Sequence, residues 1–93
     1  MSDRTLATSK AMESEVIAFT NALSKEADFI SKCKAVSFYS TENVHVSFDE
    51  PANTGSFFVP KTTYVHINEP CEFTRISALG DSTTGNLYIL ARR

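Results

Sequence analysis

The pattern of hydrophobic and polar positions changes near residue 35. Beyond this point, apolar and polar side chains alternate over short runs, which is the period of a β-strand with one buried face. The clearest run is 44–49, in which Val44, Val46 and Phe48 share one face. The chain after residue 35 is therefore predicted to be β-structure.

Turn residues divide this part of the chain into short strands. Residues 41–43 are predicted to form a tight turn, the segment 68–70 is expected to end a strand, and 80–85 is expected to be a hairpin-like loop. Connections this short leave no room for crossover helices, so the pairing should be mostly antiparallel. The predicted fold class is mainly β, a small antiparallel β-sandwich or a jelly-roll-like barrel. Its strands are expected over 36–40, 44–49, 56–59, 62–67, 72–79 and 86–91.

Residues 9–30 follow a different pattern, because their apolar residues recur at steps of three and four. This spacing places them on one face of a helix and favours a helix over a strand. A short strand over 16–19, followed by a turn at 21–24, remains the alternative. We therefore expect a segment or arm over 1–34, with about 9–32 helical or an extra strand pair, packed on an antiparallel β-domain over 35–93. The periodic residues are Met12, Val16, Phe19, Leu23, Ala27 and Ile30.

Composition and charge narrow the classes of function. The 93 residues are 42% hydrophobic and 22% charged, with a formal net charge of −2, which is typical of a folded domain. The few scattered basic residues lack the footprint that nucleic acid binding needs. There is no apolar run of membrane-spanning length and no basic-then-apolar start, so neither a membrane partner nor secretion is expected.

The residues that could carry chemistry do not form a recognisable set. Cys33 and Cys71 are expected to be buried thiols, because disulfides are uncommon without secretion. His45 and His66 lie on the polar faces of their strands; they could face each other as a pair, although solvated side chains are the favoured interpretation.

A hydrolytic triad or a calcium site is not expected either. His45, Ser47 and Asp49 share one strand face, but the strand rise separates them by about 6.6 to 13 Å. Asp49 and Glu50 supply too few oxygens for calcium. We therefore predict no catalytic, cofactor-binding or metal residue, and a protein that is not an enzyme.

Four aromatic residues are the candidate interface. Phe57 and Phe58 are adjacent, so they point to opposite faces of a strand; one can enter the core, and the other must be covered. Tyr64 and Tyr88 are out of phase with the apolar faces of their strands. Large exposed apolar patches are uncommon on monomers, so we expect a homo-oligomer or another protein partner, with coverage by the N-terminal segment as the alternative.

Residues 35–91 also resemble a known group of proteins. The opening is Ala-Val-Ser-Phe-Tyr-Ser-Thr-Glu-Asn-Val-His-Val-Ser-Phe over 35–48, followed by Ser-Phe-Phe-Val-Pro over 56–60 and Tyr-Val-His-Ile over 64–67. Ile-Ser-Ala-Leu-Gly over 76–80 leads to a closing Gly-Asn-Leu-Tyr-Ile over 85–89. This order resembles the small β-sandwich structural proteins of tailed bacteriophage virions.

The resemblance implies a structural role in the virion, after assembly in the host cytoplasm. A capsid decoration (cement) protein that binds the major capsid protein is the first expectation; a neck, head-completion or tail component is the alternative. The resemblance brings no catalytic residue or cofactor. From the residues alone, a small carbohydrate-binding β-module is a further alternative, with Tyr64, Tyr88 or Phe58 as a stacking platform.

Overall fold

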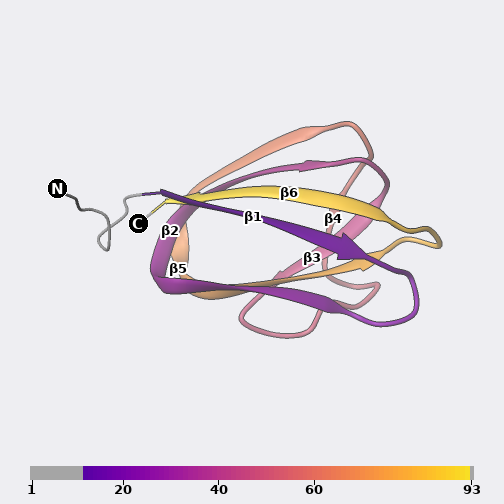
Figure 1. The fold of residues 1–93 in the computed structure, drawn as a ribbon, viewed down its shortest axis with the longest axis horizontal. Coiled ribbons are helices and arrows are strands. Elements are labelled where there is room, and N and C mark those ends of the chain that lie inside the picture. The colour runs from indigo at the N-terminus through magenta and orange to yellow at the C-terminus, as the bar shows by residue number, and fades with distance from the viewer. Residues whose placement is uncertain (1–11, 93) are drawn as a thin grey trace, which may run out of the picture.

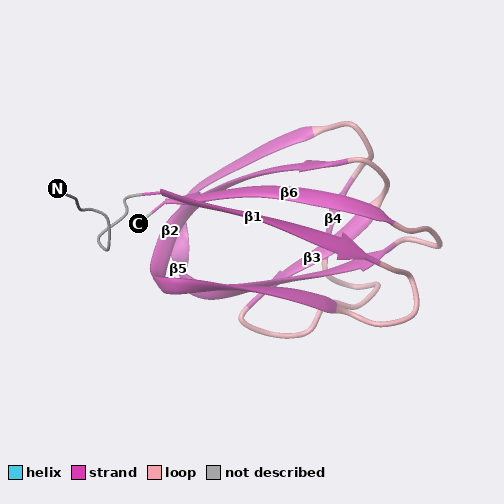
Figure 2. Cartoon of the chain, in the orientation of Figure 1, coloured by secondary structure: helices cyan, strands magenta, loops and turns pink. Residues whose placement is uncertain are grey.

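The structure, a computed structural model, describes residues 12–92, with the backbone alone at residues 30, 31 and 69–71. Every regular element in this range is a β-strand (Figures 1 and 2). The range contains no helix long and apolar enough to cross a membrane. The predicted mainly-β fold class is confirmed. The strands are β1 (Met12–Phe19), β2 (Lys25–Ser40), β3 (Val44–Phe48), β4 (Phe57–Val59), β5 (Tyr64–Gly80) and β6 (Gly85–Arg92).

The six strands form one antiparallel sheet that folds over into two layers. Layer A contains β1, β6, residues 35–40 of β2 and residues 64–68 of β5, in the order β1-β6-β2-β5. Layer B contains residues 25–28 of β2, residues 75–80 of β5, β3 and β4, in the order β2-β5-β3-β4. Two antiparallel layers connected in this way form a jelly roll, one of the two architectures predicted from the sequence.

β2 and β5 pass from one layer to the other at a shared bend, on the left of Figure 1. The pairing is irregular there, with register shifts on both sides of Cys33. The predicted end of a strand at 68–70 is wrong, because β5 continues from Tyr64 to Gly80 through Pro70. Proline cannot donate to the hydrogen-bond ladder, so a strand accepts it where the pairing is already interrupted.

The helix favoured by the periodicity of residues 9–30 is wrong over its described part, and the strand alternative is correct. In β1, Ile17 and Phe19 are buried, whereas Val16 and Ala18, which alternate with them, are exposed. A loop over 20–24 carries the exposed Leu23 and leads into β2. β2 then runs without a break through residues 34 and 35, so the N-terminal part supplies strands to both layers.

Four connections cross between the layers at the end of the sandwich opposite the bend: 20–24, 41–43, 60–63 and 81–84 (Figure 1). Asn43 links two of them, because its side-chain oxygen accepts from the Lys61 N–H at 2.8 Å and its carbonyl from the Asp81 N–H at 3.0 Å. The loop predicted over 80–85 is present, but it is not a hairpin. It joins β5 in layer B to β6 in layer A, and these strands are not neighbours in the sheet.

Aromatic rings fill the space between the layers. The ring of Phe48 in β3 lies 6.1 Å from Phe38 in layer A and 5.0 Å from Phe73 near the bend, measured between centroids. Aliphatic side chains such as Ile76 and Leu87 are fully buried around them. Because the described interior is occupied by apolar side chains, a functional site is expected on the outer faces of the layers.

Candidate functional site

A row of exposed side chains crosses the outer face of layer A. Val16 lies opposite Tyr88, Tyr88 opposite Tyr39, and Tyr39 opposite Tyr64, so one residue from each strand contributes. Their exposed fractions are 54%, 46%, 38% and 67%. Successive side chains of a strand alternate between faces, so register alone brings these four to one side of the sheet. We call them the tyrosine row.

A shallow depression of about 200 Å³ lies beside the tyrosine row. It is lined by the three tyrosines together with Ser37 and Leu90, and by residues 38 and 89. The Ser37 hydroxyl lies 2.8 Å from Nδ1 of His66 on the neighbouring strand. Ligand pockets for drug-sized molecules are about 300–1,000 Å³, so this depression suits a single ring or side chain.

The two outer faces differ in charge. By register, the outward positions of layer A are hydroxyl, amide, aromatic and apolar residues, with Arg92 and His66 as the basic side chains among the described residues. Layer B carries Glu26, Asp28 and Arg75 at outward positions. The outer face of layer A is thus the aromatic side of the molecule, with fewer charged residues and no acidic one among the described positions.

The charges of layer B are largely satisfied within the chain. Arg75 Nε lies 2.7 Å from a carboxylate oxygen of Asp28 and 3.6 Å from one of Glu26. The hydrogen bond to Asp28, and the negative charges of Asp28 and Glu26, raise the pKa of Arg75 above its ordinary value. Exposed ion pairs of this kind contribute little to stability, and they leave layer B as a hydrated surface.

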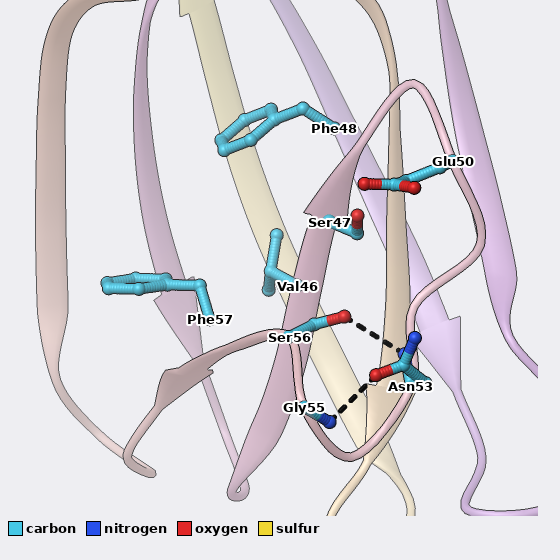
Figure 3. Close-up of a pocket in the computed structure, with 8 residues that line it drawn as sticks. All are labelled: Val46, Ser47, Phe48, Glu50, Asn53, Gly55, Ser56 and Phe57. Atoms are coloured by element: carbon cyan, nitrogen blue, oxygen red, sulfur yellow. Dashed lines mark hydrogen bonds between the residues drawn. The ribbon is translucent and has the colours of Figure 1, made fainter.

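Phe57 and Phe58 lie apart from the tyrosine row, on the short edge strand β4 of layer B. The prediction that one of them enters the core is wrong, because both are exposed, and Val59 is the buried residue of β4. Phe57 lines an open hollow of about 450 Å³ together with Phe48, Glu50, Asn53 and other residues of the 49–56 loop (Figure 3). Phe58 packs against His45, with ring centroids 5.4 Å apart.

Two of the three hypothetical triad residues, His45 and Asp49, make hydrogen bonds to groups outside the triad. The two ring nitrogens of His45 lie 3.3 Å from the Ser56 carbonyl and from an Asp81 carboxylate oxygen. Asp49 accepts hydrogen bonds from the backbone N–H groups of residues 74 and 75. His66 lies on the outer face of layer A and His45 on that of layer B, so the hypothesis of a facing histidine pair is wrong.

Metal-ligand chemistry is sparse in the described part of the chain. Residues 12–92 hold no cluster of three His, Cys, Asp or Glu side chains that could bind a metal ion. Asp49 is engaged with the backbone of β5 and does not join Glu50 in a cation site. Cys33 is buried, as predicted; the side chain of Cys71 lies outside the described residues, so their pairing is untested.

The structure divides the four predicted interface residues between two surfaces. Tyr64 and Tyr88 belong to one row, and Tyr39, which sequence reasoning missed, lies between them. The signal was present in the run 36–40, where Phe38 is buried and its neighbours Ser37 and Tyr39 face outward. Comparisons with protein-family models, with curated proteins and with solved structures found no match.

Proposed function

We propose that this chain is a non-enzymatic structural protein of a tailed bacteriophage virion. Within this class, our first proposal is a capsid decoration protein that binds the major capsid protein lattice. The observation that carries the proposal is the tyrosine row on an outer face with few charged residues, opposite a face that carries Glu26, Asp28 and Arg75. Tyrosine is enriched where protein interfaces are buried, and charged residues are depleted there. The role in a virion comes from the sequence resemblance of residues 35–91.

The fold is consistent with this proposal by analogy. Jelly rolls are found in viral capsid proteins, lectins and cupins, so the architecture admits the role without specifying it. A neck, head-completion or tail position in the virion would use the same type of attachment surface and is the alternative within this class.

Co-sedimentation with undecorated capsids of the phage that encodes the chain tests the proposal. We expect the wild type to pellet with capsids and the double variant Tyr39→Ser, Tyr88→Ser to remain largely in the supernatant. Phe58→Ser is the matched control, because it removes an exposed aromatic ring from the other layer and should bind like the wild type. A wild-type chain that stays in the supernatant with capsids, necks and tails contradicts the proposal.

One observation favours a second candidate function, carbohydrate binding. The depression beside the tyrosine row combines aromatic rings with the Ser37 hydroxyl, and its volume of about 200 Å³ suits one sugar ring. A glycan array followed by calorimetry on any hit tests it. Binding that is lost in Tyr39→Ser supports this function, and an array without hits contradicts it.

A further inference from the structure

β1 forms one margin of layer A. It pairs with β6 along all eight of its residues, from Met12 opposite Arg92 to Phe19 opposite Gly85, without a register shift. On its other side it pairs with none of the described strands. Natural proteins protect such an edge with proline, lysine, a bulge or inward-pointing charges, because its unpaired N–H and C=O groups can pair with another chain. β1 contains no proline, glycine, lysine or bulge. Its charged side chains are Glu13 and Glu15 at inward positions, and whether they repel a second chain depends on the register of the pair.

We propose that β1 pairs with β1 of a second copy of this chain, antiparallel and about a two-fold axis perpendicular to layer A. The two copies of layer A then become one continuous layer with both outer faces on the same side. The edge groups of each copy are satisfied by identical groups of the other, as in an isologous interface. The inference does not rest on the proposed function, since it concerns only the edge of the sheet.

Symmetry and charge select the register. In antiparallel pairs, opposite residues face the same side of the sheet, so the two-fold axis must pass beside a residue that lies opposite its own copy. The two registers that pair most of β1 centre on Glu15 or on Val16. The Glu15 register places two carboxylates directly opposite each other, which destabilises the pair.

The Val16 register avoids this repulsion. Val16 lies opposite Val16 of the second copy, Glu15 lies opposite Ile17, and Ser14 lies opposite Ala18. The outward side chains at this edge are therefore small or β-branched and uncharged. The repulsion between two Glu15 carboxylates therefore disfavours the register centred on Glu15 and helps to select the register centred on Val16.

Other margins of the sandwich are poorer templates for pairing. β4 has only three residues, and the free margin of β5 in layer A covers residues 64–68, between Pro60 and Pro70. The margin of layer B formed by β2 covers residues 25–28 and is followed by register shifts at Cys33. Of these margins, β1 is the one that is paired regularly along its whole length of eight residues.

The dimer joins two tyrosine rows into one. Each row ends at Val16, so the pair of valines on the axis connects Tyr88, Tyr39 and Tyr64 of one copy with the same residues of the other. Four strands spaced about 4.8 Å apart and on average about seven residues long give each copy an outer face of roughly 450 Å². Two copies together present roughly 900 Å², close to the ~800 Å² that each partner of a standard interface buries.

Sedimentation velocity over a series of concentrations tests the dimer. We expect a species of twice the 10.3-kDa chain mass to grow with concentration. Val16→Lys should shift the chain to a monomer, because a lysine on each copy would meet its own like charge on the axis. Leu23→Lys is the control, since Leu23 is exposed in the loop after β1 and should leave the dimer unchanged. A wild type that stays monomeric, or a Val16→Lys variant that stays dimeric, overturns the proposal.

Disulfide trapping tests the register. Opposite α-carbons in an antiparallel pair are about 4.5–5.5 Å apart, within the range that a disulfide spans. Val16→Cys should therefore cross-link to its own copy with oxidised glutathione as the oxidant. Ala18→Cys should not, because four residues of strand, about 13 Å, separate it from its copy. The wild type measures cross-linking by the native cysteines. Equal cross-linking of the two variants overturns the Val16 register.

Discussion

Gly80 and Thr83 approach so closely that a β-carbon on Gly80 would lie 1.9 Å from the Thr83 carbonyl oxygen. The same carbon would lie 3.0 Å from the ring of Phe19. The backbone of Gly80 also donates a hydrogen bond to the Thr20 carbonyl at 2.8 Å, so the strand end cannot move away freely. Gly80 therefore lets the 81–84 connection pack on the end of β1.

Gly80→Ala should lower the free energy of unfolding by about 1–3 kcal/mol, because the added methyl group overpacks this site. Urea denaturation followed by circular dichroism measures the change. Gly55→Ala is the matched control: its β-carbon would meet only the Asn53 side-chain oxygen at 3.2 Å, in an exposed turn. Equal denaturation midpoints for Gly80→Ala and the wild type would contradict this explanation.

Asp49 has a left-handed backbone, with φ of 60°, and its carboxylate binds the N–H groups of Thr74 and Arg75 at 2.9 and 3.0 Å. Asp49→Ala should lower the free energy of unfolding by about 2–4 kcal/mol, because it loses two hydrogen bonds and places alanine in an unfavourable conformation. Asp49→Asn keeps an acceptor oxygen and tolerates this conformation, so it should cost about 1 kcal/mol or less. Chemical denaturation distinguishes the two, and equal losses would contradict the argument.

Ser40 and Ser77 are both completely buried but differ in their hydrogen bonds. Ser40 donates to the Glu42 carbonyl, whereas the Ser77 hydroxyl has no hydrogen-bond partner among the described residues. An unsatisfied buried polar group costs about 1–3 kcal/mol, so Ser77→Ala should raise the free energy of unfolding by roughly 1 kcal/mol. Ser40→Ala should lower it by a similar amount. Thermal and urea denaturation measure both changes, and a destabilised Ser77→Ala would contradict the prediction.

The burial pattern of β1 differs from that of the strands after Val36, and this difference explains which elements the sequence could predict. From Val36 onward, one face of each strand is mostly buried, so alternation is visible. In β1, the inward positions begin with Glu13 and Glu15, and the exposed Met12 and Val16 point outward. An edge strand with acidic inward positions lacks the alternation that identifies a strand, so the three- and four-residue spacing dominated.

The long bent strand β5 shows a second limit of local patterns. Asn68-Glu69-Pro70 has the composition of a strand end, and pairing does change there. The chain stays extended because β5 passes from one layer to the other here, and β2 makes the same bend beside it. This tertiary context overrides the local signal, because the sheet continues across the bend.

The tyrosine row was only partly predictable for a related reason. Tyr64 and Tyr88 stand out within their own strands as out-of-phase aromatic residues, which a single strand is enough to reveal. That they share a surface with Tyr39 and Val16 depends on the order β1-β6-β2-β5. Strand order arises from connections far apart in sequence, so a candidate surface can be assembled only once the topology is known.

The two proposals together predict that dimerisation strengthens attachment to the capsid. Val16→Cys offers a matched comparison, because the same chain can be studied with its cross-link oxidised or reduced. Below the concentration at which the reduced chain dimerises, the oxidised form should bind capsids at least tenfold more tightly, since its second face binds at a high effective concentration. Quantitative co-sedimentation over a range of protein concentrations measures both affinities. Equal affinities would mean that one copy's tyrosine row makes the whole contact, so that the dimer has no part in attachment.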